Sequence, residues 1–286
     1  MSSAKATYPE QLVQYNSTKN EIMVFDTPTK FVNLIEKHRL YNGDSYWSGE
    51  STQDCAKYTR IGNTKLVPEA ERIIAKLQTN LPDLQPSWSS DIAGDMVVVP
   101  EYIVGLPEHM RRKIPNETQG APLRVLFDTT SSGGIGHGIL TIRGTTVLAL
   151  LMRLIVERPV EFWLVGIYDC PQDIAVMVRV PTTPLNLGLA THLLTSGAIT
   201  RSFMYGIAHS LGWSGGWNQS YKRKGGIKSG KDLTEAMRKF FDAGNTDLMI
   251  PPAIYGYQDC NEDVWKQPLK WINERLSEGR IYEEAA

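Results

Sequence analysis

The sequence predicts an α/β fold: a single domain with a mixed, partly parallel sheet, flanking helices and a flexible aromatic-basic loop. Two apolar runs, residues 123–127 and 160–167, enclose a long apolar segment, residues 139–157, which is long enough for a helix and ends before Pro159. The order strand, helix, strand is typical of a parallel βαβ unit with a right-handed crossover. With 286 residues, of which 42% are hydrophobic, the chain is large enough to bury a core around this unit.

Further helices and strands are expected on both sides of this unit. Before it, the spacing of apolar residues predicts helices within residues 25–40, 54–60 and 68–81, and a strand over residues 96–99. After it, we predict a strand over residues 174–180 and helices over residues 186–196, 198–209, 233–241 and 264–276. Residues 1–20 are expected to form a polar arm and residues 277–286 an acidic tail, which leaves residues 21–276 as the domain.

Cysteine content and charge restrict the class of protein. The three cysteines, Cys55, Cys170 and Cys260, are far apart and odd in number, so we expect a reducing compartment without a disulfide framework or a zinc site. The amino terminus has no apolar leader and no stretch approaches the ~20 apolar residues of a membrane span, so we expect a soluble protein that is not secreted and has no membrane partner. The net charge of -1 argues against a protein that coats nucleic acid with its whole surface.

The charges are unevenly distributed along the chain. No Asp or Glu occurs between residues 174 and 230, and a flexible segment rich in aromatic and basic residues, the aromatic-basic segment (residues 209–232), falls mostly inside this window. Aromatic rings that stack on bases, each worth roughly 1 to 3 kcal/mol, and cations that follow phosphates are the means by which proteins hold single strands. The alternative is a surface loop with buried tryptophans and solvated lysines. The predicted nucleic-acid-binding residues are Arg201, Trp213, Trp217, Tyr221, Lys222, Arg223, Lys224, Lys228 and Lys231.

Two other stretches are secondary candidates for phosphate contacts. The basic run is Arg111, Arg112 and Lys113, although a solvated loop is the more common explanation of three consecutive cations. Ser131 and Ser132 lie in a glycine-rich loop whose backbone amides, at the start of a helix, can bind an anion without a metal. The simplest alternative for this loop is a turn that only lets the following helix pack.

The same loop also offers a metal-site motif. Asp128-x-Thr130-x-Ser132 resembles the Asp-x-Ser-x-Ser metal motif of von Willebrand factor A domains, from which it differs by a threonine in place of the first serine. In both cases the motif follows a buried strand. Magnesium prefers such hard oxygen ligands. That motif also requires a threonine and an acid from later loops, and the candidates here are Thr182 or Thr183 and Asp169. This alternative interpretation implies a metal-dependent protein-interaction module that works with an ATPase partner.

Signatures of enzymes and nucleotide-binding proteins are missing from the sequence. The five histidines show no metal-ligand spacing, and His137 beside Ser131 and Ser132 is the single local pair that resembles a nucleophile and a base. The glycine-rich loop lacks the Gly-Lys-Ser/Thr ending of a P-loop and does not match the dinucleotide fingerprint. We therefore expect a protein that is not an enzyme, with no catalytic residues and no cofactor such as ATP or NAD.

Several short motifs occur within residues 45–168: Trp47-x-Gly49, Asp91-Ile92-Ala93-Gly94, Val99-Pro100-Glu101-Tyr102, Gly105-x-Pro107-Glu108-x-Met110, Arg143-Gly144 and Val160-Glu161-Phe162-Trp163. Together they resemble a family of tailed-phage proteins of mostly unknown function. The whole chain is similar to the branch found in short-tailed phages that package a giant RNA polymerase, the Drc-type single-stranded-DNA-binding cofactors of a second, phage-encoded RNA polymerase.

This resemblance implies a non-catalytic protein that binds single-stranded DNA at promoters. It would recruit the phage-encoded RNA polymerase for middle gene transcription, in the cytoplasm of the infected bacterial host. The implied partners are single-stranded DNA and that polymerase, and a homo-oligomer is a further candidate assembly.

Overall fold

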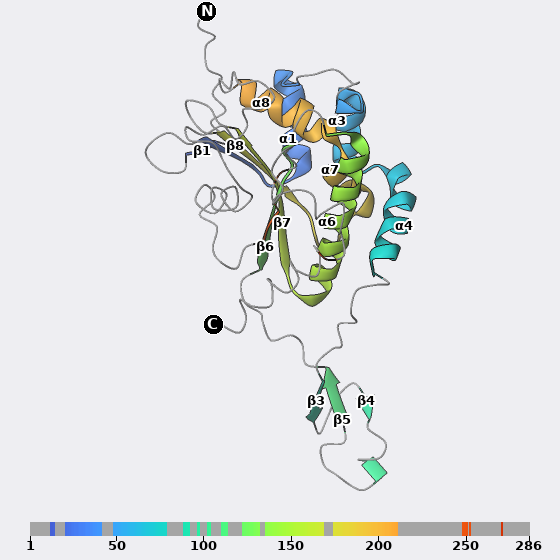
Figure 1. Ribbon diagram of the computed structural model, residues 1–286. Helices are drawn as coiled ribbons and strands as arrows, with labels where there is room; N and C mark the ends of the chain where they lie inside the picture. Colours follow the sequence, from blue (N-terminus) through green and yellow to red (C-terminus); the bar gives the residue numbers. More distant parts are fainter. Residues whose placement is uncertain are drawn as a thin grey trace, which may run out of the picture.

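A mixed sheet forms the centre of the protein, as the computed structural model shows (Figure 1). The structure describes residues 12–14, 21–41, 48–78, 88–91, 96–97, 102–103, 110–113, 122–131, 135–168, 174–210, 248–250, 252 and 270. Within these residues the sheet has six strands in the order β1-β2-β8-β7-β6-β9. Their bounds are Leu12–Gln14 (β1), Glu21–Phe25 (β2), Leu123–Asp128 (β6), Val160–Tyr168 (β7), Ile174–Val180 (β8) and Leu248–Ile250 (β9).

The pairing confirms the predicted mixed α/β fold. Strand β6 is parallel to β7 on one side and to β9 on the other, and β2 is parallel to β8. Strand β8 returns antiparallel to β7, and β1 is antiparallel to β2. Because Leu123 pairs with Val160 and Asp128 with Val165, the carboxyl ends of β6 and β7 meet at one edge of the sheet. Loops at this edge are where open α/β sheets bind ligands.

The helices and helical turns follow the chain in order around this sheet. They are α1 (Pro28–His38), α3 (Thr52–Ile61), η1 (Thr64–Leu66), α4 (Val67–Gln78), α6 (His137–Glu157), α7 (Leu187–Thr195), η2 (Ile199–Met204) and α8 (Tyr205–Ser210). Side-chain caps explain where three of these helices begin. The side chains of Thr27, Ser51 and Asn186 accept a hydrogen bond from a backbone amide in the first turn of α1, α3 and α7, respectively. Helices α3, α4, α6 and α7 lie together on one side of the sheet (Figure 1).

Most of the predicted elements in the described residues are confirmed. The βαβ unit is present as β6, α6 and β7, and the helices expected within residues 25–40, 54–60 and 68–81 correspond to α1, α3 and α4. The segment predicted as one helix over residues 198–209 is a π-helical turn, η2, followed by α8. The helix predicted over residues 233–241 lies outside the described residues, as does all but residue 270 of the one predicted over 264–276.

Short strands account for the differences from the prediction. Strand β1 lies in the expected polar arm, and β2 and β9 were not predicted. A second, antiparallel sheet has the order β3-β5-β4, with bounds Trp88–Asp91, Met110–Lys113 and Met96–Val97. The expectation that the basic run lies in a loop is therefore wrong, because this run pairs with β3 as part of β5. Such strands are only two to five residues long and depend on a distant partner, so a local pattern does not identify them.

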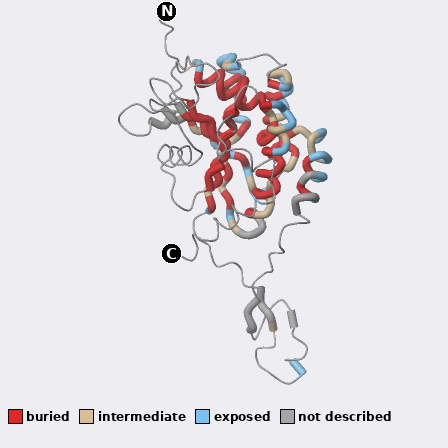
Figure 2. The backbone as a smooth tube through the Cα atoms, in the orientation of Figure 1, coloured by how far each residue is buried: buried red, intermediate tan, exposed pale blue. Residues whose placement is uncertain are grey.

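The core lies between the six-stranded sheet and the helices on its face. Figure 2 shows that the residues coloured as buried are concentrated in this region. Aromatic rings connect the layers: Phe25 packs edge-on against Phe31, and Phe31 packs edge-on against Phe203. On the central strands, Phe127 of β6 stacks with Phe162 of β7. These contacts join β2, α1, η2 and the βαβ unit into one apolar core.

Helix α6 is the longest helix in the described part of the chain, and it corrects one expectation. By length and composition a 19-residue window, His137–Ile155, has a mean hydropathy of 1.6, which is sufficient for a membrane span. The expectation that no stretch approaches such a span is therefore wrong. In this fold, 61% of that window is buried, and α6 packs against β7, α4 and α7. Packing in the core is thus a sufficient reason for its apolar character.

Gly144 allows α7 to approach α6 closely. A Cβ at this position would lie 2.4 Å from the carbonyl oxygen of Leu194, whereas a Cβ at Gly138 in the first turn of the same helix would meet nothing within 4 Å. We expect Gly144→Ala to lower the free energy of unfolding by about 1 to 3 kcal/mol, because backbone must move to make room. Gly138→Ala is the matched control and should raise it by up to about 1 kcal/mol. Urea unfolding of both variants tests this, and equal effects would contradict it.

Candidate functional site at the carboxyl edge of the sheet

The loop that follows β6 begins with a buried aspartate. Asp128 is fully buried, and its Oδ1 accepts a hydrogen bond of 2.8 Å from the amide of Thr130. The amide of Thr129 donates to the carbonyl of Val165 at 2.8 Å, so the pairing with β7 continues one residue past the strand. The carboxylate turns the chain directly at the sheet edge, as aspartate does in Asx turns.

Two buried arginines hold this loop, one near each end. Arg143 of α6 donates to the carbonyl of Asp128 at 2.6 Å, and its guanidinium lies 4.2 Å from the centre of the Phe127 ring. Arg201 of η2 donates to the carbonyl of Ile135 at 2.7 Å. Each arginine is only 3% exposed, and burial lowers the pKa of Arg201. The loop is therefore attached to two different helical segments by charged donors.

A threonine from η2 completes the polar surroundings of the loop. The hydroxyl of Thr200 donates to the carbonyl of Thr129 at 2.9 Å. Within the described residues, the buried hydroxyl of Thr130 has no hydrogen-bond partner. An unmade hydrogen bond of this kind costs about 1 to 3 kcal/mol, so this group is a candidate for a ligand contact. The carboxylate of Asp128 and the hydroxyl of Thr130 thus belong to the start of the loop, and the hydroxyl of Thr200 bonds to its backbone.

The structure places the predicted metal-motif residues as follows. Asp128 and Thr130 lie together, and Ser132 lies outside the described residues. The expectation that Thr182 or Thr183 supplies the later threonine is wrong, because Thr182 donates to the carbonyl of Val160 at 2.7 Å, at the opposite edge of the sheet. The threonine that contacts this loop from a later segment is Thr200, which bonds to the carbonyl of Thr129. The later-loop acid candidate, Asp169, is outside the described residues.

Sequence reasoning missed Thr200 because it lies within an apolar segment predicted to be an ordinary helix. Gly197 lies between that segment and the helix predicted over residues 186–196, and it marks a break between the two. A Cβ on Gly197 would lie 3.0 Å from the carbonyl oxygen of Ser48, so the chain is tightly packed just before η2.

The predicted nucleic-acid contacts are placed only in part. Arg201 is buried and bonded to the loop, so it does not lie on an exposed surface. Ser131 is also buried, and the basic run lies on β5, where the structure describes the backbone but not these side chains. The remaining predicted contacts all lie in the aromatic-basic segment, beyond Ser210 at the end of α8 and outside the described residues.

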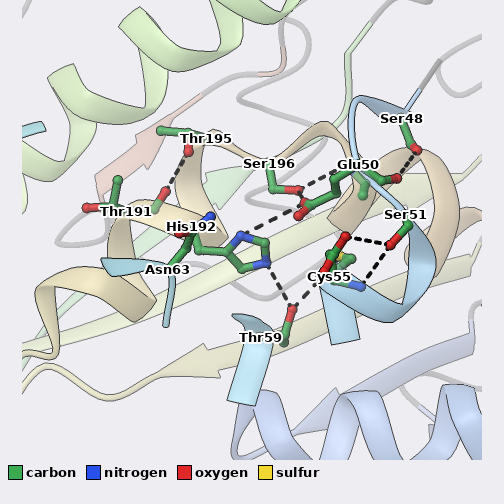
Figure 3. A network of polar contacts seen from close by, with 12 residues as sticks. Ser48, Glu50, Ser51, Cys55, Thr59, Asn63, Thr191, His192, Thr195 and Ser196 are labelled. Atoms are coloured by element: carbon green, nitrogen blue, oxygen red, sulfur yellow. Dashed lines mark hydrogen bonds and ion pairs between the residues drawn. The ribbon is translucent and has the colours of Figure 1, made fainter. Parts of the chain in front are cut away.

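A second polar cluster joins the start of α3 to α7 (Figure 3). Glu50 accepts a hydrogen bond from the hydroxyl of Ser196, and its Oε1 lies 3.9 Å from Nδ1 of His192. The other ring nitrogen, Nε2, lies 3.3 Å from the hydroxyl of Thr59, which lies 4.0 Å from the sulfur of Cys55. The cluster is formed by residues that sequence reasoning did not connect, since the histidines show no ligand spacing along the chain.

Burial determines the protonation of this cluster. It lowers the pKa of His192 to about 4, so the imidazole is neutral at pH 7 and its contact with Glu50 is not an ion pair. Burial likewise raises the pKa of the Glu50 carboxyl and raises that of the Cys55 thiol well above its ordinary value. A protonated, fully buried thiol is a poor nucleophile, so this Cys–His pair is not arranged for covalent catalysis.

Comparison with known proteins identifies one family. The family model described as "Domain of unknown function (DUF7192)" matches residues 3–255. Neither a curated protein nor a solved structure matches the chain.

The shifted pKa of His192 predicts a loss of stability in acid. The unfolded chain takes up a proton on this histidine near pH 6.5, whereas the folded chain does so near pH 4, so stability falls as the pH drops between these values. Between pH 7 and pH 5 we expect the wild-type protein to lose about 2 kcal/mol more than His192→Gln. Urea unfolding at both pH values, in the presence of a chelator, measures this difference. Parallel losses in the two proteins would contradict the prediction.

Proposed function

Since the chain belongs to the DUF7192 family of unknown function, its role has to be inferred from its own residues, and we propose that it is a divalent-cation-dependent protein-interaction module. The observation that carries this proposal is the hydroxyl of Thr200, which η2 brings to the loop that begins with Asp128-x-Thr130. A later threonine is the component that the resemblance to von Willebrand factor A domains requires.

The chemistry of the donor set suits a hard cation. Asp128, Thr130 and Thr200, with Ser132 from the same loop motif, would hold magnesium through one carboxylate and neutral hydroxyls. The unpartnered hydroxyl of Thr130 supports this assignment. Bound in this way, the ion would keep much of its positive charge and would have positions free for a further oxygen ligand. An acidic side chain of a partner protein is the complementary group, and an ATPase is the class of partner that the resemblance implies.

The two arginines support the same role. Their guanidinium groups bond to backbone carbonyls of the loop, at Asp128 and Ile135, and so hold its two ends in place. A loop that is positioned before the ligand arrives loses less conformational entropy on binding. Neither arginine is offered to a partner, because both are almost completely buried.

Removal of single loop groups tests magnesium binding. We expect Asp128→Asn to abolish binding in calorimetry and Thr200→Val to weaken it about 10- to 100-fold. The matched control is Thr182→Val, which removes an equivalent hydroxyl-to-carbonyl bond at the opposite edge of the sheet and should leave the affinity unchanged. Absence of magnesium binding by the wild-type protein would refute the proposal, as would equal effects of the two threonine changes.

A second candidate function is sequence-tolerant binding of single-stranded DNA. The observation in its favour is the aromatic-basic segment, whose residues 211–230 follow α8 in the sequence and include no Asp or Glu. In this proposal the protein is a non-catalytic, Drc-type cofactor of tailed phages that recruits a phage-encoded RNA polymerase to promoters in the host cytoplasm, alone or as a homo-oligomer. The resemblance of the motifs between residues 45 and 168 supports this assignment.

Charge-matched variants test DNA binding. We expect the double change Lys222→Ala with Lys224→Ala to weaken binding of all sequences and to reduce the salt slope by about 0.7 for each phosphate that is no longer neutralised. Trp217→Ala should weaken binding by roughly 1 to 3 kcal/mol without changing that slope. The control is Lys57→Ala with Lys65→Ala, two exposed lysines on α3 and η1. Anisotropy of a labelled oligonucleotide across a salt series measures these effects, and no binding at low salt would refute this function.

A further inference from the structure

We propose that Glu50, Cys55 and His192 form a binding site for a transition-metal ion of the zinc class. Each residue offers one ligand atom, and these atoms all lie within 4.8 Å of one another. Thiolate, imidazole and carboxylate are the three side-chain ligands that zinc takes in proteins, and a site with three of them leaves a fourth position for water or a substrate. This site is separate from the proposed magnesium site, whose ligands are oxygen atoms alone.

Rigid elements position the three ligands (Figure 3). Cys55 lies in the first turns of α3, whose cap is Ser51, and Glu50 immediately precedes that cap. His192 lies on α7, which packs against α3. Ligands on two packed helices hold a fixed spacing, which a metal site requires.

The imidazole of His192 is oriented as a metal ligand would be. Its Nε2 contacts the hydroxyl of Thr59 at 3.3 Å. Its Nδ1 faces Oε1 of Glu50 at 3.9 Å. Histidines that bind metals typically have one ring nitrogen bonded to the protein in this way, which fixes the ring while the other nitrogen meets the ion.

The electrostatic surroundings of the cluster favour a cation. In the described part of the chain no lysine or arginine forms an ion pair with Glu50, and the neighbouring Asp54 adds further negative charge. On binding, the metal would replace the thiol proton of Cys55, which passes to solvent, so that a dication meets one thiolate and one carboxylate. Glu50 is the ligand with the most exposed side chain, at 18% against 1% for His192, so the ion would reach the cluster from the Glu50 side.

The competing explanation is a closed hydrogen-bonded cluster that never binds metal. Hydrogen bonds link Ser196 with Glu50 and Cys55 with Thr59. In this explanation the network has the single role of joining α3 to α7. The two explanations differ in one observable property, since only the metal site converts the Cys55 thiol into a thiolate bonded to the ion.

Titration of the full-length, reduced protein with cobalt(II) tests the proposal, because cobalt replaces zinc and is coloured. We expect one equivalent to bind with a sulfur-to-cobalt charge-transfer band in the near ultraviolet. Cys55→Ala should abolish this band, and Glu50→Gln and His192→Gln should each weaken cobalt binding at least about tenfold. The control is Cys170→Ala with Cys260→Ala, which removes the other two cysteines and should retain the band.

The outcomes separate this site from the proposed magnesium site. Asp128→Asn should keep the cobalt band even though it abolishes magnesium binding, so either proposal can fail alone. Circular dichroism of each metal-free variant establishes that it is folded, and Glu50→Gln, at the partly exposed ligand, provides a test even if Cys55→Ala does not fold. Absence of the band in the wild-type protein, or its persistence in Cys55→Ala, would overturn the proposal in favour of the hydrogen-bonded cluster.

Discussion

The close approach of α7 to α6 at Gly144 is the constraint on which both candidate sites depend. The absent side chain lets the backbone of Leu194 lie against α6. From that contact α7 presents His192 to α3, and the chain continues past Gly197 into η2, which carries Thr200 and Arg201 to the loop after β6. A bulkier residue at position 144 would displace both polar clusters together, because a close-packed interior transmits a shift along a rigid helix.

The loop after β6 and its surroundings bury charged groups, and hydrogen bonds compensate for the free energy of burying them. Burying two guanidinium groups and a carboxylate is unfavourable unless each is hydrogen-bonded. Here Arg143 and Arg201 donate to backbone carbonyls, and Asp128 accepts from the amide of Thr130. These bonds position the loop at the carboxyl edge of the sheet, between the ends of strands that run in the same direction. Within the described residues, the hydroxyl of Thr130 makes no such bond.

The two polar clusters differ in the cations they suit. The loop after β6 offers oxygen atoms alone and therefore favours a hard ion such as magnesium. The cluster at α3 and α7 adds a sulfur and an imidazole nitrogen, which favour a softer ion. Its neutral histidine and protonated thiol show how strongly burial disfavours the charged forms of these groups. The spacing of the cysteines along the chain predicts no zinc site, but it carries no information on groups such as Glu50, Cys55 and His192, which meet only in the fold.

The sequence by itself determined the parts of this protein that depend on neighbouring residues. Apolar periodicity was enough to predict the βαβ unit and helices α1, α3 and α4, and composition alone identified the aromatic-basic segment. The tertiary structure decided which polar groups meet. The hydrogen bond of Thr200 spans 71 residues, that of Thr59 with His192 spans 133, and that of Ser196 with Glu50 spans 146. No local pattern encodes such pairs, because they arise from how closely the helices pack on the sheet and on one another.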